Sequence, residues 1–208
     1  MFLSASRRTD VVAIYCDWLF NRLKEGYVLV RNPHYYHQVG KINLSNKLID
    51  CIIFWTKNPE KIYNRLEELR DHNYYFQITI NNYGKEFEPV IPSIDKIINL
   101  VEKLSSKIGP KRIVWRYDPI VLTKEFDLKF HIQNFEVLAS KLKNNINKCV
   151  FSFLDVYLQT EENLKKYGLI IIDELKMKEI AKKLSEVAQK YNIDWRHAVK
   201  KLIYQNLA

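Results

Sequence analysis

An arginine and an aspartate stand close together where a strand-like run ends. The segment "IVWRYDPIV", residues 113–121, begins with branched and aromatic side chains typical of a strand and then places Arg116 and Asp118 before Pro119. Arginine binds carboxylate or phosphate through planar, bidentate N–H donors. Since side chains two residues apart on a strand point to the same side, the two residues could equally pair with each other. The segment therefore indicates either an anion-binding position or an ion pair that braces the strand end.

Five other strand-like segments also end in polar or charged residues. Their ends read "SRRTD", "RNP", "TKNP", "TINNY" and "SFLDVY". In a parallel α/β fold the carboxyl ends of all strands lie on one face, and ligands bind there. We therefore predict a site for a small anionic ligand or substrate on that rim, without a metal and with no catalytic residue assigned. The predicted ligand-binding residues are Arg7, Arg8, Asp10, Arg31, Asn32, Lys57, Asn58, Arg116, Asp118 and Asp155.

The elements that would position these residues alternate between strand and helix. Helical spacing of apolar residues is found over 11–25, 59–71, 93–107, 127–143, 160–167 and 173–191. Strand-like runs separate these segments, a pattern that predicts βαβ units and a parallel sheet. The chain has only five glycines and no glycine-rich loop after its first strand, which favours a barrel over a doubly wound sheet. We predict an α/β fold with a TIM-type (β/α) barrel, incomplete or open, of about six parallel strands over residues 1–192.

The last residues are predicted to form a separate, divergent helical tail over 193–208. Trp195, Val199, Leu202 and Ile203 recur at helical spacing, which predicts an amphipathic helix over 195–206. A barrel of six strands would leave an open edge, and proteins normally cover such edges. The tail is therefore expected to pack on that gap or on a second copy of the chain, forming a homodimer.

Composition limits the classes of function. No apolar run approaches the roughly 20 residues that a membrane-spanning helix needs, and the start lacks the order of charges of a signal peptide. We therefore expect a cytoplasmic protein without a membrane partner. The net charge of +9 suits anionic partners, nucleic acid among them, although many lysines recur at the spacing of a solvated helix face.

The three cysteines, Cys16, Cys51 and Cys149, are far apart in the sequence and form no CxxC pair. This spacing argues against a disulfide framework and against a self-contained zinc or iron–sulfur site. We expect all three to be largely buried thiols without a metal.

The strings "SASRRTD", "VRNP", "FWTKNP", "YYFQITI", "IGPKRIVWRYDPI" and "SFLD" together resemble an uncharacterised bacterial and archaeal family, a domain of unknown function. The resemblance runs from about residue 3 to 192. It implies a TIM-type barrel similar to those of radical SAM enzymes. For full-length members it also implies a [4Fe–4S] cluster held by three cysteines and S-adenosylmethionine as the cofactor.

This sequence departs from the family pattern after "AQKYNI". It continues as "DWRHAVKKLIYQNLA", without a cysteine beyond Cys149, whereas a cluster needs several thiolate ligands. We therefore expect no cofactor in this chain and read it as a naturally short, frame-disrupted or truncated member. Three functions stay open: an enzyme-type barrel with an anion-binding mouth, a non-catalytic module for nucleotides or nucleic acid, and a remnant without activity.

Overall fold

The computed structural model describes residues 1–6, 8–146, 148–154 and 168–197. The chain divides into two compact units, residues 1–78 and residues 79–208. Unit 1 and unit 2 are described one after the other.

Unit 1 is built on three parallel strands. Strand β4 (Cys51–Thr56) pairs with β1 (Phe2–Ala5) on one side and with β5 (Tyr74–Thr79) on the other. Burial alternates along β4 and β5, so that one face of each strand is buried and the other is half-exposed. Phe54 and Phe76 lie on the buried face with ring centroids 5.2 Å apart. These strands therefore have one core face and one face that the described helices do not bury.

Short helices supply the rest of the core of unit 1. The predicted helix over 11–25 is interrupted at Tyr15, which separates α1 (Val11–Ile14) from α2 (Cys16–Glu25). The predicted helix over 59–71 is likewise two pieces, α3 (Glu60–Tyr63) and the 3₁₀ turn η1 (Leu66–Leu69). Gly26 ends α2 in a left-handed conformation, with φ of 77°. The helices thus begin and end close to where the sequence predicts, but they are less continuous.

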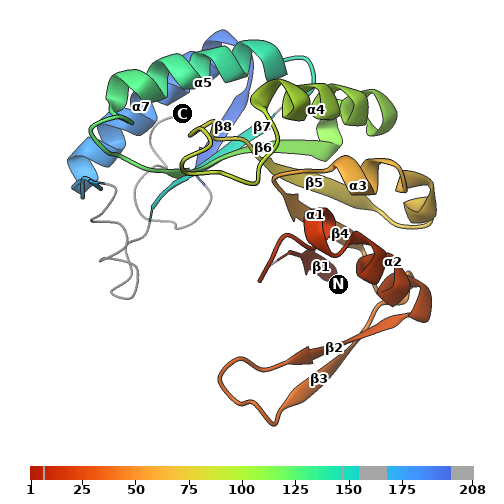
Figure 1. Ribbon diagram of the computed structural model, residues 1–208. Coiled ribbons are helices and arrows are strands. Elements are labelled where there is room, and N and C mark those ends of the chain that lie inside the picture. The colour runs from red at the N-terminus through yellow and green to blue at the C-terminus, as the bar shows by residue number, and fades with distance from the viewer. Residues whose placement is uncertain (7, 147, 155–167, 198–208) are drawn as a thin grey trace. The chain divides into compact units, whose positions relative to one another are not determined.

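The segment "YVLVR" is not part of the parallel sheet, which corrects one prediction. It forms β2 (Tyr27–Arg31), which pairs with β3 (Val39–Asn43) in a separate antiparallel hairpin. Figure 1 shows this two-stranded ribbon. The sequence does not reveal the pairing, because seven residues separate the strands and "VGKIN" carries a glycine and a lysine in place of the usual strand pattern.

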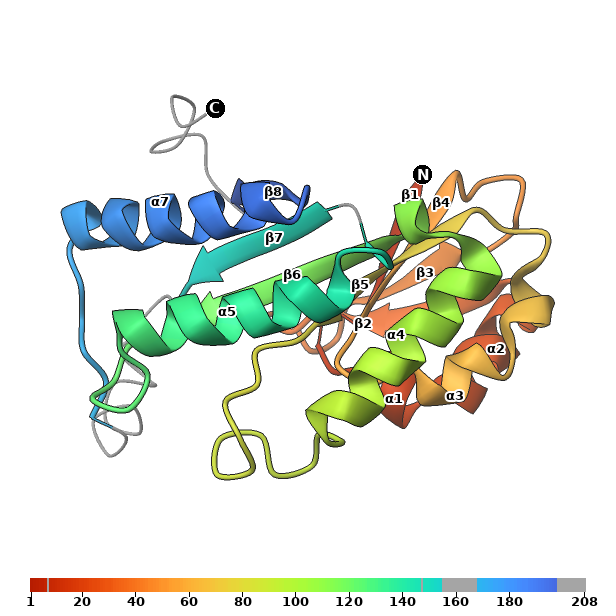
Figure 2. The ribbon, with the colours of Figure 1, turned by 90° about the horizontal axis from the view of Figure 1, so that it is seen from above.

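Unit 2 has its own set of parallel strands, with helices along one face. Strand β7 (Lys148–Phe153) pairs with β6 (Ile113–Ile120) on one side and with β8 (Asp194–His197) on the other. Long helices lie beside these strands (Figures 1 and 2). They are α4 (Ile94–Ile108), α5 (Leu128–Leu142) and α7 (Glu174–Lys190), and the short turn η2 (Pro110–Arg112) precedes β6.

Large aromatic side chains fill the space between β6 and α5. Trp115 and Tyr117 alternate with Val114 and Arg116 along β6 and are fully buried. The Trp115 ring stacks on Phe135 of α5 at a centroid distance of 4.6 Å, and its indole N–H donates to the carbonyl of Ile80. Arg116 and Asp118 alternate with these rings and therefore lie on the opposite face of β6.

Strand β8 corrects the prediction for the tail. Residues 195–197 belong to a strand and not to the predicted helix over 195–206. Trp195 lies flat on Phe151 of β7, with centroids 4.1 Å apart, and meets Phe135 edge-on. The rest of that predicted helix, and the predicted helix over 160–167, lie outside the described residues.

The parallel strands follow the order β1-β4-β5-β6-β7-β8 in a six-stranded sheet. The predicted number of parallel strands is therefore confirmed, although the sixth strand is β8 and not "YVLVR". Within the described residues β1 and β8 are the two ends of this order, so the barrel is not closed. No helix among the described residues is long and apolar enough to span a membrane.

Candidate functional site

The predicted site residues fall into the two units. Arg8, Asp10, Arg31, Asn32, Lys57 and Asn58 belong to unit 1, and Arg116 and Asp118 belong to unit 2. Arg7 and Asp155 lie outside the described residues. That all of them share one rim stays a prediction, and each group is described within its own unit.

In unit 1, Asp10 joins the loop after β1 to the loop after β4. One carboxylate oxygen accepts from the backbone N–H of Ala13, 2.9 Å away, and so caps α1. The other accepts from the hydroxyl of Thr56 at 2.9 Å and from the backbone N–H of Lys57 at 2.8 Å. Asn58 accepts from the backbone N–H of Glu60 at 3.1 Å and shapes the turn into α3. The carboxylate of Asp10 therefore holds two loops together.

Arg31 and Asn32 lie at the end of β2, where the hairpin turns. The Asn32 side chain accepts from the backbone N–H groups of His34 and Tyr35 and donates to Gln38. A guanidinium nitrogen of Arg8 donates to the backbone carbonyl of Arg31 at 2.7 Å. These two predicted residues therefore belong to an antiparallel ribbon and not to a carboxyl end of the parallel sheet.

In unit 2, Arg116, Asp118 and Ser152 form a cluster on neighbouring strands. The Arg116 guanidinium donates to one carboxylate oxygen of Asp118, and the Ser152 hydroxyl donates to the other. Arg116 is only 8% exposed. The sequence left open whether Arg116 and Asp118 pair with each other or bind an anion; they do pair, and Ser152 was not identified from the sequence. Because Val150 lies opposite Arg116, alternation along β7 puts Ser152 on the same face, and this is the signal that could have found it.

The backbone of Asp118 is held by the side chain of Asn81, which follows β5 and is 2% exposed. The Asn81 amide donates to the carbonyl of Asp118 at 3.0 Å and accepts from its N–H at 2.9 Å. The next peptide bond, Asp118–Pro119, is cis. The hydroxyl of Tyr83 donates to the Pro119 carbonyl at 2.7 Å, and burial raises the pKa of Tyr83 well above its usual value. Hydrogen bonds thus hold the backbone on both sides of the cis peptide bond.

A buried polar network that was not predicted from the sequence lies behind this turn. His131 contacts the Val121 carbonyl through Nε2 at 2.9 Å and the Tyr117 hydroxyl through Nδ1 at 2.8 Å. Because a carbonyl can only accept, Nε2 carries the proton and the Tyr117 hydroxyl donates to Nδ1. Asn134 donates to the Tyr117 oxygen and to the Asn81 carbonyl. Burial lowers the pKa of His131 and raises that of Tyr117.

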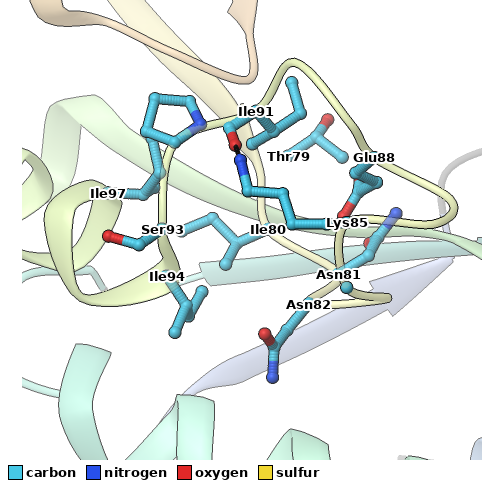
Figure 3. A pocket seen from close by; sticks show the side chains of 12 residues that line it. Thr79, Ile80, Asn81, Asn82, Lys85, Glu88, Ile91, Ser93, Ile94 and Ile97 are labelled. Carbon is cyan, nitrogen blue, oxygen red and sulfur yellow. Dashed lines mark hydrogen bonds between the residues drawn. The ribbon is translucent and has the colours of Figure 1, made fainter.

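A pocket of about 230 Å³ opens beside Asn81 (Figure 3). Ile94 and Ile97 of α4 form one wall, and Asn81 and Asn82 come from the segment after β5. The Lys85 ammonium crosses the pocket to donate to the Ile91 carbonyl. The lining is mostly apolar with a few amide and charged groups, as in pockets for small molecules.

The cysteines do not fit an iron–sulfur cluster. Cys16 and Cys149 are buried and Cys51 is half-buried, and none of them is in a disulfide. Cys51 is thus less deeply buried than the other two cysteines. Within the described ranges, no three His, Cys, Asp or Glu side chains gather closely enough to hold a metal ion. The donors described here thus do not match the thiolate set that such a cluster requires.

The fold is similar to that of spore photoproduct lyase. A structure of the lyase complexed with a dinucleoside spore photoproduct has a TM-score of 0.63 and 12% sequence identity, and a double variant with bound AdoMet and the same photoproduct has a TM-score of 0.64. The alignment covers 95% of this chain and 60% of the lyase chain in both cases, so the chain spans less than two thirds of the length of those proteins. A search of curated proteins finds no match. The family model described as domain of unknown function DUF1848 matches residues 2–207, and the chain belongs to that family.

Proposed function

We propose that unit 2 binds a small ligand with an amino-acid head group, S-adenosylmethionine being the first to test. The single observation that carries this proposal is Arg116, a residue that is 8% exposed and lies in the middle of the parallel strand β6, where its guanidinium pairs with the carboxylate of Asp118. The ligand's carboxylate binds at Arg116 and its ammonium binds at Asp118.

The chemistry of the two side chains suits a zwitterion. Arginine has five N–H donors in a rigid plane, enough to bind Asp118 and a ligand carboxylate together. Each carboxylate oxygen of Asp118 has a second acceptor position beyond the bonds from Arg116 and Ser152. The ammonium group of the ligand would therefore donate to the carboxylate of Asp118, which Arg116 and Ser152 already hold in one orientation.

The pocket beside Asn81 supports a ligand larger than an amino acid. Asn81 lines this pocket and its side chain also holds the backbone of Asp118, so this one residue connects the pocket with the Arg116–Asp118 pair, although neither Arg116 nor Asp118 lines the pocket. Its isoleucines offer apolar walls to the rest of the ligand. The lyase of similar fold has been solved with bound AdoMet, which supports this choice of ligand. Since the described cysteines do not fit a cluster, no radical step is assigned to this chain.

Isothermal titration calorimetry with three ligands tests the proposal. We expect S-adenosylmethionine and S-adenosylhomocysteine to bind and 5′-methylthioadenosine, which lacks the amino-acid group, to bind much more weakly. Arg116→Lys and Asp118→Asn should each weaken binding of the first two by about 10-fold or more, as expected for a lost hydrogen bond to a charged group.

Arg70→Lys and Asp71→Asn are matched controls, because they alter an exposed ion pair in unit 1. Circular dichroism of each variant verifies folding. Equal affinity for methylthioadenosine, unchanged affinity of folded Arg116→Lys, or no binding of any of the three ligands would each contradict the proposal.

A further inference from the structure

We infer that the β2–β3 hairpin of unit 1 is a binding surface for single-stranded nucleic acid. The inference is independent of the ligand site in unit 2. It rests on the charge, the exposed rings and the fixed geometry of the hairpin.

The hairpin is exclusively basic. From residue 27 to residue 49 the sequence contains Arg31, Lys41 and Lys47 and no aspartate or glutamate. Residues 103–117 are also basic and without a carboxylate, so the hairpin is distinguished by the exposed rings that accompany its cations. A segment of this kind attracts a polyanion, because no carboxylate repels the phosphates.

Both cations of the ribbon lie on one face, together with aromatic rings. Arg31 pairs with Val39 and Lys41 pairs with Leu29, and these positions alternate with the other face of the ribbon. The Arg31 guanidinium lies 4.2 Å from the centre of the Tyr36 ring, and the Lys41 ammonium lies 4.4 Å from that of Tyr27. This basic–aromatic face, made of Tyr27, Leu29, Arg31, Tyr36, Val39 and Lys41, interleaves cations with planar rings.

The tip of the hairpin, residues 32–38, presents more rings to solvent. Tyr35 and Tyr36 are 66% and 67% exposed, and His34 and His37 are also exposed. Large rings are seldom left so exposed unless they contact a partner. Aromatic side chains stack on bases of any sequence, and a basic groove or face follows the phosphates.

The tip is held in a defined shape. The Asn32 N–H donates to the Gln38 carbonyl at 2.9 Å, and its side chain accepts from the N–H groups of His34 and Tyr35. The Gln38 N–H donates to the Tyr35 carbonyl at 2.9 Å. Because these bonds already order the loop, little conformational entropy is lost when the rings contact a base.

Fluorescence anisotropy with a labelled 12-nucleotide oligothymidylate tests the inference on the full chain. We expect binding that weakens as salt increases. Tyr36→Ala should reduce the affinity by about 10-fold, because stacking of one base is lost, whereas Tyr36→Phe should retain it. The double variant Arg31→Gln/Lys41→Gln should lower the slope of log K against log salt by about 1.4, since about 0.7 is lost for each phosphate contact to a single strand.

Two variants outside the hairpin are the controls. Tyr15→Ala removes an exposed tyrosine of unit 1, and Lys103→Gln removes an exposed lysine of α4, and both should bind like the wild type. Folding of the hairpin variants is verified by circular dichroism. The inference is overturned if the oligonucleotide does not bind or if folded Tyr36→Ala binds as tightly as the wild type. It is also overturned if a duplex of the same length binds better, or if vesicles of phosphatidylglycerol compete for the hairpin and the oligonucleotide does not.

Discussion

Arg116 and Asp118 lie on a regular strand, and hydrogen bonds from neighbouring side chains hold Asp118 in place. Asn81 uses both its donor and its acceptor on the backbone of Asp118, and Ser152 orients the carboxylate. The proposed site therefore depends on residues that need not touch a ligand. Asn81 is also part of the buried polar network, because the side chain of Asn134 donates to the backbone carbonyl of Asn81.

Replacing Asn81 by alanine should destabilise the protein. The change leaves the buried N–H and carbonyl of Asp118 without their partner, at a cost of about 1–3 kcal/mol for each unsatisfied group. Thermal unfolding followed by circular dichroism should show a melting temperature lower by several degrees. Asn99→Ala, at an exposed position on α4, is the control, and an equal shift in both variants would show that the Asn81 bonds contribute nothing.

His131 should make the stability depend on pH. Its pKa is lowered in the folded state by burial, whereas the unfolded side chain has a pKa of about 6.5. Below about pH 6.5 the unfolded chain therefore takes up a proton that the folded chain does not. The free energy of unfolding should fall on acidification until the pH drops below the lowered native pKa.

Urea unfolding between pH 7.5 and pH 5 measures this effect. His131→Gln should be less stable than the wild type at pH 7.5 and should lose less stability on acidification. The pKa of His72 is also lowered by burial, so the unfolding free energy of this variant should still depend on pH to some extent. His37→Gln, at an exposed position, is the control. An unchanged slope in His131→Gln would refute the assignment.

At the scale of elements, the helices were easier to predict than the strand pairing. The helices over 94–108, 128–142 and 174–190 follow the apolar periodicity of the sequence closely. Strand pairing depends on contacts between distant residues, and "YVLVR" satisfies the local pattern of a sheet strand although its partner is in a hairpin. In "DWRH" the alternation of charged and aromatic residues predicts a strand, but the helical spacing of Trp195 and Val199 suggested otherwise.

Trp195 should be the residue that secures β8. Its ring stacks on Phe151 of β7 and meets Phe135 of α5, so Trp195→Ala should cost about 2 kcal/mol of stability. Trp195→Phe should retain most of the stacking. Trp18→Ala, which removes a more exposed tryptophan of α2, should cost less. Equal chemical denaturation midpoints for Trp195→Ala and the wild type would show that β8 adds no stability.

At the scale of the molecule, each unit carries one candidate surface of its own. Unit 1 has the basic hairpin, and unit 2 has the Arg116–Asp118 pair and the pocket beside Asn81. The charged residues at strand ends could be predicted, because the type of each residue and its place after an apolar run are visible in the sequence. It could not reveal Asn81 as the support of Asp118, because the two are 37 residues apart and meet only in the folded protein.

Thiol reactivity should distinguish the three cysteines in the native protein. Cys16 and Cys149 are buried, and burial raises the pKa of both thiols, so each forms little of the reactive thiolate. Cys51 is half-buried and should be labelled first by a maleimide reagent followed by mass spectrometry. One modification is expected on a time scale at which all three react in urea. Rapid modification of Cys149 in the native state would show that the core of unit 2 opens readily.

Strand β6 also constrains how this family can vary in length. Trp115 and Tyr117 face the core, and Arg116 and Asp118 face the other side of the same strand. One inserted residue before Trp115 would exchange the two faces, placing charged groups against α5 and rings in the proposed ligand site. Insertions and deletions of single residues should therefore be absent from this strand in viable relatives. Length changes would instead be tolerated around Lys124 and Glu125, where the side chains are exposed and no strand register is fixed.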